Sequence, residues 1–200
     1  MPISIEHVWR ILHRRGLLAL AVVSALTTGC AQLPLGNPTA SFENIEKANV
    51  SRTAAVAVGL FKIDTRANAE IDKGLSVRSN TISSPFEGSF SQYLRQTLIT
   101  DLKAAGLYDA AAQTTLSGFL TGSTLDVPIE TGNASLSARF ILVRTGKTIY
   151  DKELKASVTW PSSFIGVEAI PAGINQYSSL YHQLVGKLLD DPDYRSANPK

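Results

Sequence analysis

Two neighbouring stretches of alternating apolar and polar residues constrain the fold of this chain most strongly. From Asn133 to Val143 every second side chain is apolar, and Lys147 to Trp160 repeats the pattern after Thr145-Gly146. Such alternation is typical of antiparallel strands that pack one face on a core and leave the other in water. A two-residue connection ending in glycine favours a tight hairpin. The sequence therefore predicts two paired strands with one polar, open face.

Two further strands are expected. Thr115 to Val127 alternates in the same way and is stopped by Pro128. Thr53 to Phe61 is apolar on both faces, which is typical of a central strand that is buried on both sides. The polar stretch after Phe61 holds one short strand candidate, Leu75 to Arg78.

Two helices complete the pattern. Ser84-Pro85-Phe86-Glu87 has the form of a capping box with proline at the first helical position, and Gly106 follows the last apolar turn. These signals predict a helix over 85–105. A second helix is expected over 167–190. Because proline is tolerated only in the first helical turn, Pro171 places its start near Glu168 to Ile170.

The order strand, helix, three strands, helix (β-α-β-β-β-α) favours an α+β fold. We expect a two-layer sandwich, with a mostly antiparallel sheet of about four strands and both helices on one face.

The N-terminus has the features of a secretion signal. Arg10, Arg14 and Arg15 precede an uncharged apolar run from Gly16 to Leu26. That run is well short of the roughly 20 residues that a helix needs to cross a bilayer. A basic flank, a short apolar core and small residues after it are typical of a signal peptide. The sequence predicts a signal over 1–29.

Leu26-Thr27-Thr28-Gly29-Cys30 resembles the lipobox of bacterial lipoproteins, with Thr27 where leucine is more common. The resemblance implies cleavage between Gly29 and Cys30, a diacylglyceryl thioether on Cys30 and an acylated new N-terminus. Cys30 is the only cysteine of the chain, so no intramolecular disulfide can form. Ala31, in place of the aspartate associated with inner-membrane retention, implies an outer-membrane lipoprotein anchored by its acyl chains and facing the periplasm.

The predicted mature chain is electrically neutral. The signal removes three arginines and one glutamate from the 19 basic and 17 acidic residues, which leaves 16 of each. A nucleic-acid partner would normally require a basic surface, so none is expected. We expect a lipidated N-terminus with a flexible tether over 30–45, a single periplasmic domain over 46–191 and a polar tail over 192–200.

This element order, together with the lipobox, resembles small envelope lipoproteins. Among them are auxiliary lipoproteins of lipid-transport ABC systems and lipoprotein domains of curli-type secretion and cell-wall-synthase activation. A more specific resemblance is to a proteobacterial lipoprotein family of unassigned activity. The segments that carry it are Ser84-Pro-Phe-Glu-Gly-Ser-Phe90, Ala138-Arg-Phe140, Gly146-Lys-Thr-Ile-Tyr-Asp151 and Ala169-Ile-Pro-Ala172.

Few residues suggest catalysis. His182 is the only histidine of the mature chain, and its place in the last helix indicates a solvated side chain. Gly146-Lys147-Thr148 lacks the first glycine of a phosphate-binding loop and is better explained as a hairpin turn. No metal site or cofactor is expected, although weak calcium binding by Asp190, Asp191 and Asp193 stays open. Carboxylates that could catalyse a reaction exist, but no spacing singles out a pair: Glu130, Asp151, Glu153 and Glu168.

The remaining candidate site is a surface. The polar sheet face and the apolar residues before the last helix are the two parts of a candidate partner surface: Ser135, Ser137, Arg139, Asp151, Glu153, Lys155, Trp160 and Phe164. We expect a non-catalytic component of an envelope transport or biogenesis system that binds a protein or a lipid. Two alternatives stay open, a carboxylate-dependent envelope hydrolase or transferase and a purely structural periplasmic lipoprotein.

Overall fold

The computed structural model describes residues 32–200. The predicted signal, its cleavage site at Gly29 and the predicted lipidation site at Cys30 lie outside the described residues. No helix among the described residues is long and apolar enough to cross a membrane.

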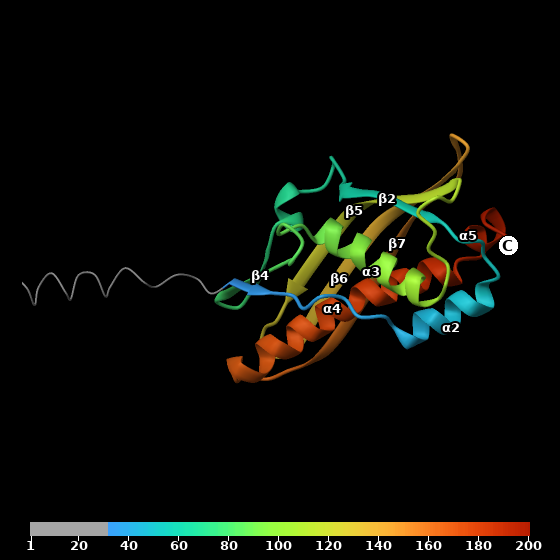
Figure 1. Ribbon diagram of the computed structural model, residues 1–200. Helices are drawn as coiled ribbons and strands as arrows, with labels where there is room; N and C mark the ends of the chain where they lie inside the picture. The colour runs from blue at the N-terminus through green and yellow to red at the C-terminus, as the bar shows by residue number, and fades with distance from the viewer. Residues whose placement is uncertain (1–31) are drawn as a thin grey trace, which may run out of the picture. The chain divides into compact units, whose positions relative to one another are not determined.

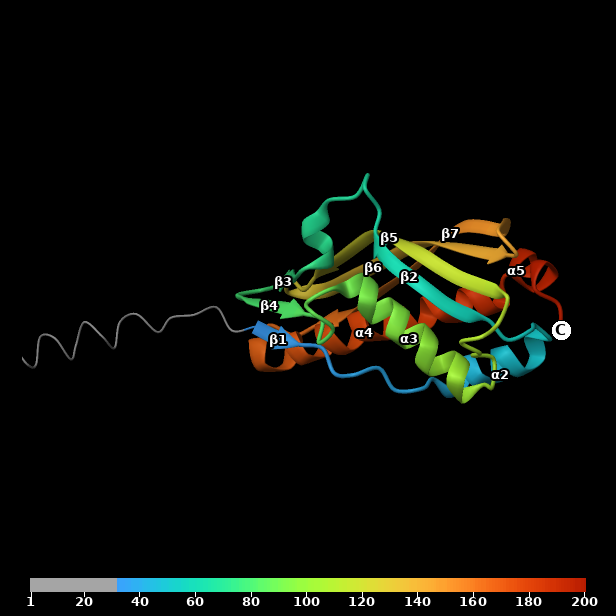
Figure 2. The ribbon, with the colours of Figure 1, turned by 45° about the horizontal axis from the view of Figure 1, so that its top comes forward.

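The main sheet has four strands in the order β2-β5-β6-β7. β2 (Ala57–Ile63) pairs in parallel with β5 (Thr114–Asp126). β5, β6 (Glu130–Arg144) and β7 (Lys147–Ser162) form an antiparallel meander. Helices α3 (Phe90–Ala104) and α4 (Gly166–Asp190) lie side by side on one face of this sheet (Figures 1 and 2). The predicted α+β sandwich, with its mostly antiparallel sheet and two covering helices, is confirmed. The prediction of a central strand over 53–61 is wrong, because β2 is an edge strand and Leu60 is 66% exposed.

The hairpin between β6 and β7 has the tight turn that the sequence predicts. Thr145 has φ 47° and Gly146 has φ 81°, so both central residues are left-handed. This is the backbone of a type I′ turn, whose twist matches that of the flanking strands. Gly146-Lys147-Thr148 is therefore part of a hairpin and does not form a phosphate-binding loop.

Period-2 alternation determines which side chains enter the core. The inward side chains of β5 and β6 are fully buried beneath apolar residues of both helices. They include Leu116, Leu120, Leu136, Phe140 and Leu142. At the end of this core, Trp160 is only 7% exposed. The prediction that Trp160 belongs to a partner surface is therefore wrong, because its indole fills the space left by the absent side chains of Gly132 and Gly173.

The first covering helix begins later than the sequence predicts. α3 starts at Phe90 with Ser89 as its N-cap, and the Ser89 hydroxyl accepts from Gln92 N–H. The expected capping box is wrong because Glu87 and Gly88 both have positive φ, which ends any helix there. Ser84 instead caps a turn, accepting from Phe86 N–H at 3.1 Å. At the other end the expected glycine is confirmed: Gly106 has φ 70°.

The last helix also differs at its start. α4 begins at Gly166, before the expected Glu168 to Ile170, so Pro171 lies in the second turn. Proline at that position leaves the carbonyl of Val167 without its helical donor. Val167 is 79% exposed, so water can satisfy this carbonyl and the helix continues past the proline.

The segment expected to be a tether is packed against the domain. β1 (Gln32–Pro34) pairs in parallel with β4 (Asn80–Ser83), which pairs with β3 (Leu75–Val77), the predicted short strand. Leu35 is 2% exposed, and helix α2 follows over Phe42–Ser51. The tether prediction is wrong from Gln32 onward, because Leu33 and Leu35 contribute to the apolar core.

The C-terminal residues are also ordered in the fold. The chain ends in α5 (Pro192–Ala197), which follows α4. The remaining element, the 3-10 turn η1 (Ala69–Asp72), lies between β2 and β3. Tyr194 is 1% exposed and its ring packs edge-on against Tyr150 at 5.7 Å. The expected polar tail is therefore wrong, and the domain extends from Gln32 to Lys200 rather than from 46 to 191.

Candidate functional site

The face of the main sheet opposite α3 and α4 carries most of the predicted partner surface. We call it the open sheet face; its residues are Asp64, Arg66, Thr121, Ser135, Ser137, Arg139, Asp151, Glu153 and Lys155. The structure brings together all six predicted polar residues of this set. Three further members, Asp64, Arg66 and Thr121, were not predicted. Phe164 does not belong to this face.

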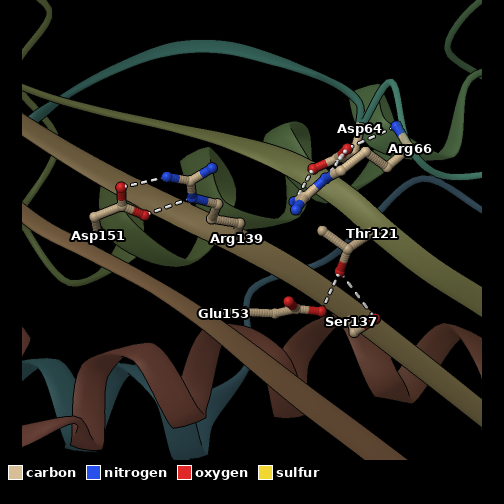
Figure 3. Close-up of polar contacts among 7 residues, drawn as sticks. All are labelled: Asp64, Arg66, Thr121, Ser137, Arg139, Asp151 and Glu153. Atoms are coloured by element: carbon tan, nitrogen blue, oxygen red, sulfur yellow. Dashed lines mark hydrogen bonds and ion pairs between the residues drawn. The ribbon is translucent and has the colours of Figure 1, made fainter.

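Strand register determines the contacts within the open sheet face. Arg139 lies directly opposite Glu153 on β7. Its guanidinium nevertheless pairs with the diagonal neighbour Asp151, through Nε to Oδ1 at 2.6 Å and Nη2 to Oδ2 at 2.5 Å (Figure 3). This bidentate pair lowers the pKa of Asp151 and raises that of Arg139, in both cases first through the side-chain hydrogen bonds. Both charges are thereby held in fixed positions on the surface.

Hydroxyl groups link the three strands beside this ion pair. Thr121 Oγ1 on β5 donates to Glu153 Oε1 on β7 at 2.7 Å, reaching across β6. Ser137 Oγ on β6 lies 3.0 Å from the same Thr121 oxygen (Figure 3). Ser135 and Thr124 form an equivalent pair one step along the strands at 2.9 Å. These contacts keep polar side chains flat on the sheet.

A second ion pair lies on the same face, directly after β2. Arg66 follows β2 and binds Asp64 with its backbone N–H and with Nε and Nη2, over 2.8 to 3.0 Å (Figure 3). The hydrogen bonds from the Arg66 side chain, and then that from its backbone, lower the pKa of Asp64 to about 2. No clear sequence signal indicated this pair, because the predicted strand ended at Phe61, whereas β2 continues to Ile63, directly before Asp64.

The open sheet face is electrically balanced. The nine residues that define it include three cations, Arg66, Arg139 and Lys155, and three anions, Asp64, Asp151 and Glu153. Two of the cations already bind anions of the same face, whereas Lys155 has no ion-pair partner among residues 32–200. A face of this kind does not select a strongly charged ligand. It suits a polar partner that meets both signs of charge.

The same face continues into an apolar area that the sequence analysis missed. Phe119, Ile141 and Val143 alternate with buried neighbours on β5 and β6, so they point outward and are half-buried. Phe119 lies opposite Arg139, and Ile141 opposite Asp151. The alternation that predicted Ser135, Ser137 and Arg139 would have found Ile141 and Val143 if extended two steps. Mixed polar and apolar area is typical of protein interfaces.

His182 is less solvated than the sequence predicts. Its Nδ1 lies 3.0 Å from Oδ2 of Asp101, whose side chain is fully buried. The same carboxylate accepts from Ser41 N–H at 2.8 Å and from the Asn44 amide at 2.7 Å. A pocket of about 370 Å³ lies beside this cluster, lined among others by Ser179 and His182. The cluster joins α2, α3 and α4 and explains why the N-terminal segment is held in place.

The three C-terminal aspartates are paired with cations. Asp190 binds Lys47 at 3.0 Å and Arg195 at 2.8 Å. Lys152 binds Asp191 at 2.8 Å and Asp193 at 2.9 Å. Asp191 Oδ1 also caps α5, and its pKa is lowered by Lys152 and by the backbone N–H groups that it accepts from, against the opposing effect of burial. Among the described residues no cluster of potential metal ligands is present.

The other candidate carboxylates do not converge. Asp151 and Glu153 bind Arg139 and Thr121 on the open sheet face. Glu168 accepts from the Ser163 hydroxyl at 2.8 Å at the start of α4, and Glu130 begins β6 with φ 79°. The contacts of these four residues bring no two carboxylates to one point.

No family model matches the chain, and a search of curated proteins finds no match. Solved structures with a similar chain path come from several bacteria. The Xanthomonas campestris protein XCC0632, described by the family model DUF330, has a TM-score of 0.49 at 13% identity over 80% of this chain and 95% of its own. The Chlamydia trachomatis protein CT253 gives 0.46 at 13%, over 73% and 99%. A minor lipoprotein of Acinetobacter baumannii gives 0.36 at 12%, over 74% and 97%. These values are too low to transfer an activity, ligand or partner.

Proposed function

We propose that the chain is a lipoprotein of the bacterial envelope, held in the outer membrane by acyl chains on Cys30 and exposed to the periplasm. The proposal is supported by the order basic flank, short apolar run and Leu26-Thr27-Thr28-Gly29-Cys30. Two or three acyl chains would hold the protein firmly, since each buried methylene contributes roughly 0.8 kcal/mol.

We further propose that the anchored domain is a non-catalytic binding component of an envelope transport or biogenesis system. The observation that carries this proposal is the open sheet face, where Arg139, Asp151, Thr121 and Glu153 are fixed by mutual contacts and charges of both signs balance. Preorganised polar side chains beside half-buried Phe119 and Ile141 lose little freedom when a protein partner covers them.

The anchor is tested by Cys30→Ser. We expect this variant to keep its signal and to incorporate no labelled fatty acid. It should be absent from the outer-membrane fraction. A Cys30→Ser chain that is processed and fractionated like the wild type would contradict the anchor.

The binding role is tested by crosslinking in cells followed by purification of the acylated protein. We expect one envelope component to co-purify with the wild type and to be lost with Lys155→Glu, a charge reversal on the open sheet face. Lys187→Glu is the matched control, because Lys187 is also exposed but lies on α4 on the covered side of the sheet. Equal recovery with both variants, or no partner with the wild type, would contradict the role of this face.

A further inference from the structure

Four large apolar side chains are exposed together near the start of α4. Phe164, Ile165 and Val167 are 77%, 52% and 79% exposed, and Ile129 in the β5–β6 turn is 56% exposed. We call these four residues the apolar tip. Isolated apolar residues on a surface are ordinary, but a group of them marks a site of contact with a protein or a membrane.

Arg78 holds the parts of this tip together. From the β3–β4 turn its Nε donates to the Val127 carbonyl at 3.0 Å, in the β5–β6 turn. Its Nη1 donates to the Phe164 carbonyl at 3.0 Å and its Nη2 to the Ser163 carbonyl at 2.5 Å. The two turns and the start of α4 therefore form one end of the domain, and the exposed side chains have a fixed backbone beneath them.

The described chain begins at this same end. Gln32 pairs with Thr81 on β4, three residues beyond Arg78. Both ribbon views place β1, the β3–β4 hairpin and the start of α4 together, with α2 and α5 at the opposite end (Figures 1 and 2). Only Ala31 separates Gln32 from Cys30. Since a residue spans at most about 3.6 Å, the covalent chain from Gln32 to Cys30 is at most roughly 7 Å long.

We propose that the apolar tip is a membrane-contact surface that inserts into the interfacial region of the bilayer holding Cys30. This proposal rests on the anchoring of Cys30 proposed above. Acyl chains attached so close to Gln32 would bring this end of the domain to the lipid. The chain that follows Gln32 cannot act as a spacer, because β1 pairs with β4 and Leu35 is buried. Phenylalanine and branched aliphatic side chains favour the boundary between headgroups and acyl chains, roughly 5–10 Å deep.

The orientation also suits the open sheet face. β5 and β7 end at the tip and β6 begins there, so the strands of the sheet run toward and away from the proposed membrane surface. The open sheet face would then stand beside the bilayer and remain accessible from the periplasm, while the apolar tip fixes the height and the tilt of the domain.

The test uses the protein that cells make from the full-length sequence, purified from membranes in its acylated form. It is reconstituted in vesicles of phosphatidylethanolamine and phosphatidylglycerol. Phe164→Trp places a fluorophore on the tip. Val50→Trp is the control, because Val50 is 69% exposed on α2, at the end where Lys47 binds Asp190. With brominated acyl chains in the vesicles, we expect the added emission of Phe164→Trp to fall, because a side chain roughly 5–10 Å deep in the interface meets those chains. That of Val50→Trp should not change.

Flotation of the vesicles separates the two ways in which the proposal can fail. If both variants float and neither is quenched, the apolar tip does not enter the bilayer; if both are quenched equally, lipid contact is not specific to the tip. Either result overturns the proposal, and the anchoring of Cys30 stands. If neither variant floats, the anchoring of Cys30 is wrong and the membrane contact falls with it. Quenching confined to Phe164→Trp in floating protein supports the contact.

Discussion

The two faces of the main sheet are built from the same strands and use alternate residues for opposite purposes. Phe140 points inward, is fully buried and meets Phe61 edge-on at 6.1 Å. Its neighbour Arg139 points outward and forms an ion pair that is more than one-third exposed. The covered face thus contributes most of the free energy of folding, while the open sheet face contributes little stability.

The largest effect should come from the covered face. Phe140→Ala removes a fully buried ring and leaves a cavity, which should lower the free energy of unfolding by about 3–5 kcal/mol. Arg139→Ala, one residue away, should lower it by only about 0–1 kcal/mol, because exposed ion pairs contribute little. Urea unfolding followed by circular dichroism measures both. Similar losses for the two variants would contradict the division between the faces.

A smaller effect is expected from two glycines of the sheet. A Cβ at Gly132 would lie 2.4 Å from Trp160 Cε2 within the core, so Gly132→Ala should cost about 1–3 kcal/mol by overpacking. A Cβ at Gly122 on the open sheet face would lie 2.7 Å from the Ser137 hydroxyl, which can rotate away. Gly122→Ala should therefore be the milder change in thermal unfolding. The reverse order would contradict the assignment of Trp160 to the core.

The smallest effect concerns protonation on the open sheet face. Arg66 lowers the pKa of Asp64 from 3.8 to about 2, so the ion pair stabilises the fold fully above about pH 4. This contribution is lost as the pH falls through about 2. Arg66→Ala should return the pKa of Asp64 toward its ordinary value, as measured by NMR titration of the carboxyl carbon. An unchanged pKa would mean that Arg66 does not bind Asp64 in solution.

The sequence predicted those parts of the fold that depend on local patterns. The alternation over Asn133 to Trp160 and the left-handed pair Thr145-Gly146 both express local steric preferences, and the strands and their turn are found as expected. The start of α3 depends on a distant residue. Asp72 accepts from Ser91 N–H at 2.6 Å and from the Ser89 hydroxyl at 2.9 Å, which favours Ser89 over Ser84 as the cap.

The same distinction explains the errors at the two ends of the chain and in the site. Leu35 in a proline-rich segment gave no local sign that it would be buried, and the capping role of Asp191 could not be expected because α5 itself was not predicted. Strand alternation predicted that Arg139 and Asp151 share the open sheet face. It could not predict Asp64 and Arg66, because a loop after β2 brings them there.

The proposed role of the open sheet face is to serve as the recognition surface of the anchored domain. It is tested most directly by placing a photoreactive amino acid at position 155 or at position 187 of the full-length chain in living cells. We predict a discrete crosslinked product of one size from position 155 on the open sheet face, and none from position 187 on α4. Products of equal yield from both positions, or a product from position 187 alone, would contradict this role.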